Sequence, residues 1–317
     1  MKVTEHIKNA SSTLFSFEIL PPVKGTSIQS IYDGIDPLME FKPPFINVTY
    51  HREEYVFKER GNGLLEKISI RKRPGTVGIC SAIMNKYKVD AVPHIICGGF
   101  TKEETENALI DLNFLGIDNV LVLRGDSIKT ESTFRPHPDG HAYACDLLQH
   151  VVSMNHGKYL DEDIANPLPT NFCPGVAGYP EKHAEAPNLA TDLKYLKRKV
   201  DMGAEYIITQ MFFDNKKYCD FVKACREIGI NVPIIPGIKP LTTKNQLKLL
   251  PNLFHIDFPD DLVDAIEAAT TPQAVRQIGI EWTIQQSKEL IQFGVPCLHF
   301  YTMSKSDAVV QIAKAVF

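Results

Sequence analysis

The feature that most constrains the fold is an alternation along the chain of short apolar, strand-like runs with segments of helical pattern. Strands that alternate with helices pair in parallel and are joined by right-handed crossovers. Eight such units in 317 residues predict an α/β fold of the (β/α)8 TIM barrel type. The strand-like runs are residues 13–20, 45–50, 90–97, 119–126, 175–181, 206–214, 233–240 and 297–303.

A doubly wound sheet is the alternative fold, but no GxGxxG motif follows the first strand-like run. The first ten residues predict an extra helix ahead of the barrel. No linker or repeat of domain size divides the chain, so we expect one domain over residues 1–317. Residues 155–174 are rich in Asn, Pro and Asp and predict a long surface loop.

The clearest predicted helix begins at Thr101, which forms a capping box with Glu104. Leu109, Leu112 and Leu115 supply its buried stripe, and a glycine follows at position 116. Three further segments with apolar residues at helical spacing predict helices, and each ends on or just before a glycine. They are residues 188–202, 216–229 and 279–294.

Composition excludes several classes of protein. A net charge of -4 gives no sign of a nucleic-acid-binding protein. No apolar run has the length of a membrane span. The polar N-terminus lacks a signal-peptide core, so we expect a cytoplasmic protein. Seven scattered cysteines without CxxC spacing are typical of thiols in a reducing compartment, and no HExxH motif occurs, so we expect no metal.

Polar residues stand where the strand-like runs end, which is the active-site face of a barrel of this kind. Glu18, for example, lies inside an apolar run that stops at two prolines. Each such residue has an ordinary explanation: Glu18 in solvent, Arg124 paired with Asp126, His94 in the core. Their common position favours a shared site. Others at strand ends are Thr49, Tyr50, Tyr179, Glu181, His183, Gln210, Asp214, Lys239, Tyr301 and Thr302.

Eight motifs fall in order along nearly the whole chain: FEILPP, INVTY, VPH, VLRGD, GYPEKHAEA, DLKYLKRKVDMGAEYIITQMFFD, IIPGIKP and HFYTM. Together they resemble the catalytic domain of the methylenetetrahydrofolate reductase family, of the bacterial single-domain type. The resemblance implies a flavoprotein barrel that reduces 5,10-methylenetetrahydrofolate to 5-methyltetrahydrofolate for methionine synthesis. It implies FAD as cofactor, NADH or NADPH as electron donor, a ping-pong order, and a homodimer or homotetramer.

The resemblance also implies roles for single residues. Glu18 is the general acid, which protonates N10 and opens the substrate ring to a 5-iminium cation. An apolar strand end would raise the pKa of this carboxyl toward the range an acid needs. Asp126 stabilises the cation, and Gln210 contacts folate and nicotinamide in turn. Thr49 lies beside flavin and nicotinamide, and Lys305 stands where some members place a substrate-binding arginine.

The cofactor set that the resemblance implies is larger. Asp192, Tyr195 and Lys199 share one helix face by their spacing, and the alternative for that face is simple solvation. YHREE departs from the small-residue turn of the family at Arg52, and 155–174 is an insertion relative to compact bacterial members. The set is Thr49, Tyr50, Arg52, His94, Arg124, Gly125, Asp126, Tyr143, Ala144, Tyr179, His183, Ala186, Asp192, Tyr195, Arg198 and Lys199.

Three other functions stay open on the sequence. One is another flavin barrel, similar to proline dehydrogenase. A second is a non-catalytic folate-binding subunit that needs a redox partner. A third is a phosphate-binding barrel isomerase or aldolase that takes up no FAD.

Overall fold

A computed structural model describes residues 1–70, 73–128, 131, 133–303 and 305–317. Nine parallel strands form one sheet in the order β10-β11-β1-β2-β5-β6-β7-β8-β9. They are β1 (Leu14–Ile19), β2 (Phe45–Val48), β5 (Asp90–Ile96), β6 (Asn119–Leu123), β7 (Cys173–Gly178), β8 (Tyr206–Thr209), β9 (Ile234–Ile235), β10 (Gly237–Ile238) and β11 (Cys297–Tyr301).

The two shortest strands close the barrel. Only Pro236 separates β9 from β10; β9 pairs with β8, and β10 pairs with β11. Because proline cannot donate a ladder hydrogen bond, the eighth strand is split there into two halves. The sheet therefore has eight strand positions, and the predicted (β/α)8 barrel with its eight strand-like runs is confirmed.

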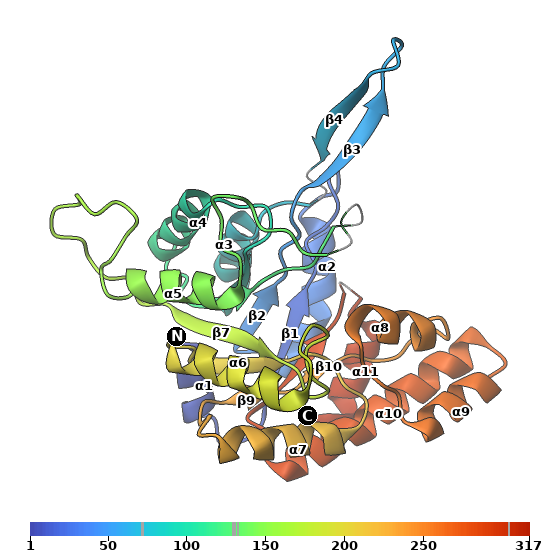
Figure 1. The fold of residues 1–317 in the computed structure, drawn as a ribbon. Coiled ribbons are helices and arrows are strands. Elements are labelled where there is room, and N and C mark those ends of the chain that lie inside the picture. Colours follow the sequence, from blue (N-terminus) through green and yellow to red (C-terminus); the bar gives the residue numbers. More distant parts are fainter. Residues whose placement is uncertain (71–72, 129–130, 132, 304) are drawn as a thin grey trace.

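Helices cover the outside of the barrel (Figure 1). The main apolar core lies between these helices and the outward faces of the strands. In the described part of the chain, no helix combines the length and apolarity needed to cross a bilayer. The helices after the first are α2 (Gln29–Ile35), the 3-10 helix η1 (Asp36–Phe41), α3 (Thr76–Tyr87), α4 (Lys102–Phe114), α5 (Ala144–Met154), α6 (Leu189–Asp201), α7 (Asn215–Glu227), α8 (Gln246–Phe254), α9 (Asp260–Ala268), α10 (Pro272–Phe293) and α11 (Asp307–Val316).

The sequence predicted α4 in detail. Thr101 Oγ1 accepts from the Glu104 N–H at 3.0 Å, and Glu104 Oε2 accepts from the Thr101 N–H at 2.9 Å, so the capping box is confirmed. Leu109 and Leu112 are fully buried. Leu115 is 44% exposed, so its predicted burial is wrong, because it is the C-cap residue at which the chain leaves the helix. The other three predicted helices correspond to α6, α7 and the second half of α10.

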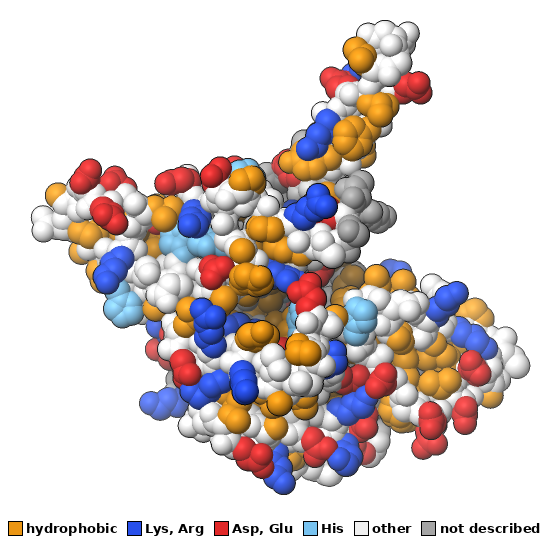
Figure 2. Space-filling view, in the orientation of Figure 1, with side chains coloured by type: hydrophobic (Ala, Val, Ile, Leu, Met, Phe, Trp, Pro, Cys, Tyr) orange, Lys and Arg blue, Asp and Glu red, His pale blue; other side chains and the backbone are white. Residues whose placement is uncertain are grey.

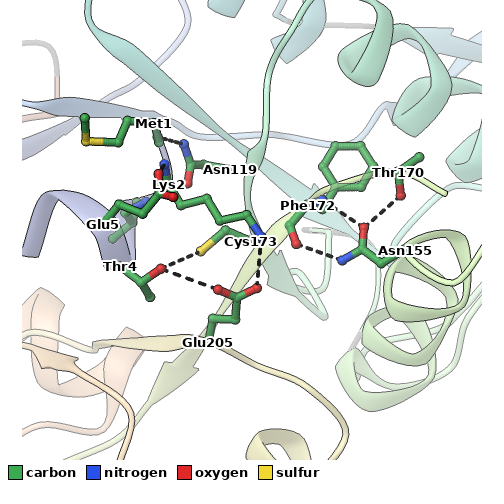
Figure 3. Close-up of polar contacts among 11 residues, drawn as sticks. Met1, Lys2, Thr4, Glu5, Asn119, Asn155, Thr170, Phe172, Cys173 and Glu205 are labelled. Atoms are coloured by element: carbon green, nitrogen blue, oxygen red, sulfur yellow. Dashed lines mark hydrogen bonds and ion pairs between the residues drawn. The ribbon is translucent and has the colours of Figure 1, made fainter. Parts of the chain in front are cut away.

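The first helix, α1 (Val3–Asn9), lies at the amino ends of the strands and confirms the predicted extra helix. Val3 is fully buried in an apolar cluster inside the barrel, with Phe45 and Tyr206 among its members. Asn119 holds the segment in place: its Oδ1 accepts from the Val3 N–H at 2.8 Å, and its amide donates to the Met1 carbonyl at 2.9 Å (Figure 3). The bottom of the barrel is therefore apolar and closed.

The predicted long loop is present over residues 155–172, and β7 begins at Cys173. Asn155 organises it: its Oδ1 accepts from Thr170 Oγ1 and from the Phe172 N–H, both at 2.8 Å, and its amide donates to the Phe172 carbonyl (Figure 3). Both ends of the loop are thus fixed to one side chain.

A β-hairpin formed by β3 (Glu54–Glu59) and β4 (Leu65–Ile70) was not predicted. It projects away from the barrel between β2 and α3 (Figure 1). Tyr55, Phe57 and Leu65 alternate onto one face of this ribbon and are 40%, 58% and 66% exposed. Alternating residues around a Gly-Asn-Gly turn at 61–63 are a hairpin signal that the sequence did contain.

Candidate active site

The upper half of the barrel interior is polar, unlike the bottom. Ser16 of β1 pairs in register with His299 of β11, and Ser16 Oγ lies 2.9 Å from His299 Nδ1. Two residues further along, Glu18 pairs with Tyr301. Because alternate residues of a strand point to the same side, Ser16 and Glu18 both face the barrel interior. Glu18 is therefore a residue of the mouth, and its predicted alternative position in solvent is wrong.

Glu18 is 9% exposed, and its Oε2 lies 3.7 Å from His94 Nε2. Burial raises the pKa of the Glu18 carboxyl to about 8, against the opposing effect of Lys239. Burial, with a smaller contribution from His51, lowers the pKa of His94 to about 3. Near neutral pH, Glu18 therefore holds its proton and His94 is uncharged, so the two form a contact between neutral groups.

Hydrogen bonds fix the strands around this acid. The Tyr301 hydroxyl donates to the Thr209 carbonyl at 2.6 Å, which joins β11 to β8 across the mouth. Thr302 Oγ1 donates to the backbone carbonyl of Glu18 at 2.7 Å. The acid is thus placed by rigid strands and their immediate extensions.

Three buried polar atoms of the mouth have no hydrogen-bond partner among the described residues: Asn47 Oδ1, Thr49 Oγ1 and His299 Nε2. The Asn47 amide nitrogen does lie 3.4 Å from His94 Nε2. Buried polar atoms without partners are rare in folded proteins. Their grouping beside the acid marks a place where a bound molecule can supply the missing partners.

Arg124 follows β6 and makes a two-pronged ion pair with Glu185, with Nη–Oε distances of 2.6 and 2.8 Å. Its guanidinium also lies over the Phe134 ring, 5.0 Å from the centroid. The predicted alternative in which Arg124 pairs with Asp126 is wrong; Asp126 is exposed to solvent. Between them, Gly125 has a φ of +85°, a conformation that suits glycine.

Arg52 reaches the same place from the segment after β2. Its guanidinium forms an ion pair with Glu131 and donates to the Arg135 carbonyl at 3.3 Å. It also lies 5.7 Å from the centroid of the Phe134 ring that Arg124 covers. Two cations from separate strand ends are therefore gathered around one aromatic ring.

On α6, Asp192 and Lys199 turn toward the strands, whereas Tyr195 is 56% exposed. Asp192 Oδ2 accepts from the His183 N–H, and Lys199 Nζ donates to the Ala177 carbonyl, both at 2.8 Å. Burial lowers the pKa of Lys199 to about 8. Simple solvation of this face is thus wrong for Asp192 and Lys199.

Two aromatic contacts order neighbouring loops. The Tyr179 and His183 rings meet edge to face with centroids 4.8 Å apart, and Tyr50 meets Phe100 in the same way at 5.1 Å. The first contact lies within the loop after β7, and the second joins the segment after β2 to the loop after β5. Figure 2 shows a hollow in the surface beside α6 and α8, with charged and histidine side chains around it.

The remaining predicted residues are either fixed within the fold or exposed to solvent. Gln210 is half-buried after β8, with its Oε1 accepting from the Met211 N–H at 2.9 Å; Ala186 is buried, and Ala144 begins α5. The sequence reasoning missed Ser16, Asn47 and His299, whose signal is a polar residue in an inward-facing position of an apolar strand. The predicted residues that the structure leaves exposed are Tyr143, Tyr195, Arg198 and Lys305.

Fold and site together define a class: a (β/α)8 barrel with a buried, proton-holding carboxyl and a group of cations at the carboxyl ends of its strands. The family model described as methylenetetrahydrofolate reductase matches residues 2–316. The chain belongs to the methylenetetrahydrofolate reductase family, as its motifs predicted.

Similar proteins agree with this assignment. "Methylenetetrahydrofolate reductase (NADH) 1" of Arabidopsis thaliana is 32% identical over 325 residues, covering 98% of this chain and 50% of the relative. "5,10-methylenetetrahydrofolate reductase" of Escherichia coli (strain K12) is 30% identical over 293 residues, covering 92% and 86%. The chain spans about half the length of the plant and fission-yeast relatives it matches.

Among solved structures, one similar fold is a Clostridium thermocellum protein described as uncharacterized and as binding two copies of 5-methyl-5,6,7,8-tetrahydrofolic acid. It has a TM-score of 0.58 and 16% identity, and the match covers 98% of this chain and 97% of that one. At this identity the likeness supports the barrel fold.

Proposed function

We propose that this protein is a flavin-dependent methylenetetrahydrofolate reductase. It reduces 5,10-methylenetetrahydrofolate to 5-methyltetrahydrofolate with NADH or NADPH as electron donor, and so supplies methyl groups for methionine synthesis. Family membership supports the activity. The single observation that carries the proposal is the Glu18 carboxyl, which is buried at the barrel mouth and protonated near neutral pH.

The acid chemistry follows from this charge state. Glu18 donates its proton to N10 of the folate, and the bond from N10 to the methylene carbon breaks with its electron pair left on N10. A 5-iminium cation remains, which is the form that accepts hydride. A carboxyl with a pKa of about 8 keeps the proton until the substrate nitrogen takes it. Because burial lowers the pKa of His94, its neutral ring does not compete as a cation for the carboxyl.

Asp126, Thr49 and Gln210 are proposed to hold the substrate. Arg124 is engaged with Glu185, so it does not occupy the Asp126 carboxyl group, which can approach the iminium cation and the guanidine-like edge of the pterin. The Gln210 amide nitrogen has two N–H donors, which suit a carbonyl of either pterin or nicotinamide. The buried Thr49 hydroxyl can pair with a ligand at the same place.

The residues present fit FAD. Lys199 is a half-buried cation whose hydrogen-bond partner is a backbone carbonyl, and burial lowers its pKa, so a phosphate oxygen nearby would stabilise its charge. Arg52 and Arg124 lie on the same side of the mouth. FAD, when bound, supplies the hydride relay between NADH or NADPH and the folate, in ping-pong order.

Replacing Glu18 by glutamine tests the proposal. Glu18→Gln is expected to leave the protein yellow and reducible by nicotinamide, while folate reduction falls by at least about a thousandfold because the proton donor is lost. The two half-reactions are followed separately by flavin absorbance under anaerobic conditions. Glu227→Gln, at an exposed position of α7, is the control. Normal folate turnover in Glu18→Gln would remove the acid from the mechanism.

The same preparation separates the other functions. A colourless protein that takes up no FAD would indicate an isomerase or aldolase. A yellow protein that no nicotinamide reduces would indicate a folate-binding subunit, and turnover with proline would indicate the other flavin barrel. The resemblance further leads us to expect a homodimer or homotetramer in the cytoplasm, which light scattering on the purified chain and cell fractionation would measure.

A further inference from the structure

Lys239 lies one residue beyond β10, at the same level along the barrel axis as Glu18. Gly237 and Ile238 pair with His299 and Phe300 of β11, so the next step of this register places Lys239 beside Tyr301. Tyr301 in turn pairs with Glu18 of β1. Lys239, Tyr301 and Glu18 therefore form one row across three neighbouring strand positions at the barrel mouth.

The direction of the lysine follows from Gly237, two residues earlier. A Cβ at Gly237 would lie 2.2 Å from the Thr209 carbonyl oxygen and 2.5 Å from the Tyr301 hydroxyl, so that side of β10 faces the barrel interior. Because alternate residues share a side, Lys239 is directed the same way. Its neighbours Ile238 and Pro240 are buried, and Lys239 itself is half-buried.

The Lys239 ammonium has no ion pair within 4.0 Å and no hydrogen bond to any residue that the structure describes. Burial lowers the pKa of Lys239, and Glu18, once ionised, raises it. Lys239 in turn lowers the pKa of Glu18. The two groups therefore influence each other electrostatically without a direct ion pair.

We propose that Lys239 is a positioning residue for the proton transfer: its ammonium stabilises the negative charge left on Glu18 once the proton has passed to the substrate nitrogen. The inference rests on the proposed function, in which Glu18 is the acid. One proton moves from the Glu18 carboxyl to N10, and the carbon–nitrogen electron pair moves to N10. Glu18 changes from neutral to -1, the substrate gains +1, and Lys239 keeps its proton throughout.

The other groups that face Glu18 do not supply this charge. His94 from β5 is neutral because burial lowers its pKa to about 3. Tyr301 from β11 stays protonated, since burial raises its pKa, with Glu18 and Tyr179 adding to the effect. Burial alone would make the Glu18 anion so costly that the acid would hold its proton too tightly. Lys239 offsets this cost.

The pKa of Glu18 can be measured directly in the ligand-free protein. The carboxyl C=O band is titrated by infrared difference spectroscopy, with Glu18→Gln to assign it. We expect a wild-type midpoint at pH about 8. Lys239→Met should move the midpoint about one pH unit higher, because an opposite charge nearby lowers a carboxyl pKa. Lys239→Arg keeps the charge and should restore the wild-type value. An unchanged midpoint in Lys239→Met would overturn the proposal.

Kinetics give the second readout. In Lys239→Met, folate reduction near neutral pH should slow about tenfold and its alkaline limb should move to higher pH, while reduction by nicotinamide is unchanged. Equal losses in both half-reactions would overturn the proposal in favour of a purely structural lysine. If the wild-type chain reduces no folate while the infrared midpoint still shifts in Lys239→Met, the proposed function fails and the coupling of Lys239 to Glu18 stands.

Discussion

Burial sets the charges of single residues in this site. Near neutral pH, Glu18 keeps a proton that an exposed glutamate would lose. His94 stays uncharged near pH 6, where an exposed histidine would bind a proton. Neither state depends on a ligand. In the proposed mechanism the proton donor is therefore ready before substrate arrives, which is what electrostatic preorganisation requires.

This preparation has a consequence for stability. Between its ordinary value of 4.5 and about 8, Glu18 is ionised in the unfolded chain and protonated in the folded one. The folded state then binds more protons, so the free energy of unfolding falls as pH rises through this window. Glu18→Gln removes that dependence. We expect the melting temperature of the variant to exceed that of wild type by more at pH 8 than at pH 4.5, measured by calorimetry.

Glu227→Gln again serves as the control, since it makes the same change of side chain at an exposed position of α7, outside the barrel mouth. Equal differences between Glu18→Gln and wild type at both pH values would show that Glu18 is ionised in the folded protein. The proposed acid would then lack its proton, whatever the activity measurements gave.

Individual site residues were predictable to different degrees. Glu18 could be found because a carboxylate inside an apolar strand needs a task or a partner. Helical spacing grouped Asp192, Tyr195 and Lys199 on one face, but it did not show that Asp192 and Lys199 turn toward the strands while Tyr195 stays exposed. The partner of Arg124 was not: Asp126 is two residues away in sequence, but Glu185, 61 residues away, holds both nitrogens. Only the folded path of the loop after β7 decides between them.

At the scale of elements, α10 supports the segment that follows Lys239. A Cβ on Gly279 of α10 would lie 1.7 Å from the backbone oxygen of Leu241. Only a residue without a side chain allows the helix to approach so closely, and backbone cannot yield as a flexible side chain can. The α10 surface therefore fixes where the chain after β10 runs, and through it where Lys239 stands.

Gly279→Ala is expected to destabilise the protein by about 1–3 kcal/mol through overpacking, in spite of the better helix propensity of alanine. The matched control is Gly78→Ala in α3, where a Cβ meets nothing within 4 Å. That variant should gain about 0.5–1 kcal/mol. Chemical denaturation of both variants measures the difference, and a Gly279→Ala protein as stable as the control would show that α10 can move away from Leu241.

The elements themselves were mostly predictable, because each strand is an apolar run, and the predicted helices have a stripe of apolar residues and a glycine at or near the C-terminal end. Strand ends were overestimated: the run 119–126 predicted one strand, yet β6 ends at Leu123 and the polar residues beyond it are candidate site residues. The split at Pro236 was also missed, since proline inside an apolar run does not show where the two halves pair. The hairpin was overlooked because it breaks the alternation of strand and helix.

At the scale of the whole molecule, stability and chemistry occupy opposite ends of the barrel. The amino ends are apolar and closed by α1, and the carboxyl ends carry the acid, the cations and the buried atoms without partners. This division is general for (β/α)8 barrels. The hairpin β3–β4 belongs to neither end, because none of residues 55–68, whose side chains the structure describes, joins an apolar cluster.

Truncation of the hairpin tests that division. Val56 and Ile68 are directly paired, so residues 57–67 can be replaced by Asn-Gly, a pair suited to a two-residue hairpin turn. Since the removed residues pack against none of the three apolar clusters, the melting temperature should stay within about 1 °C of wild type, by analogy with ordinary surface changes. Gly279→Ala, measured alongside, shows the size of a real packing loss. A drop of several degrees on truncation, together with a smaller mass in light scattering, would mean that the exposed face carrying Phe57 and Leu65 is buried against a second copy of the chain.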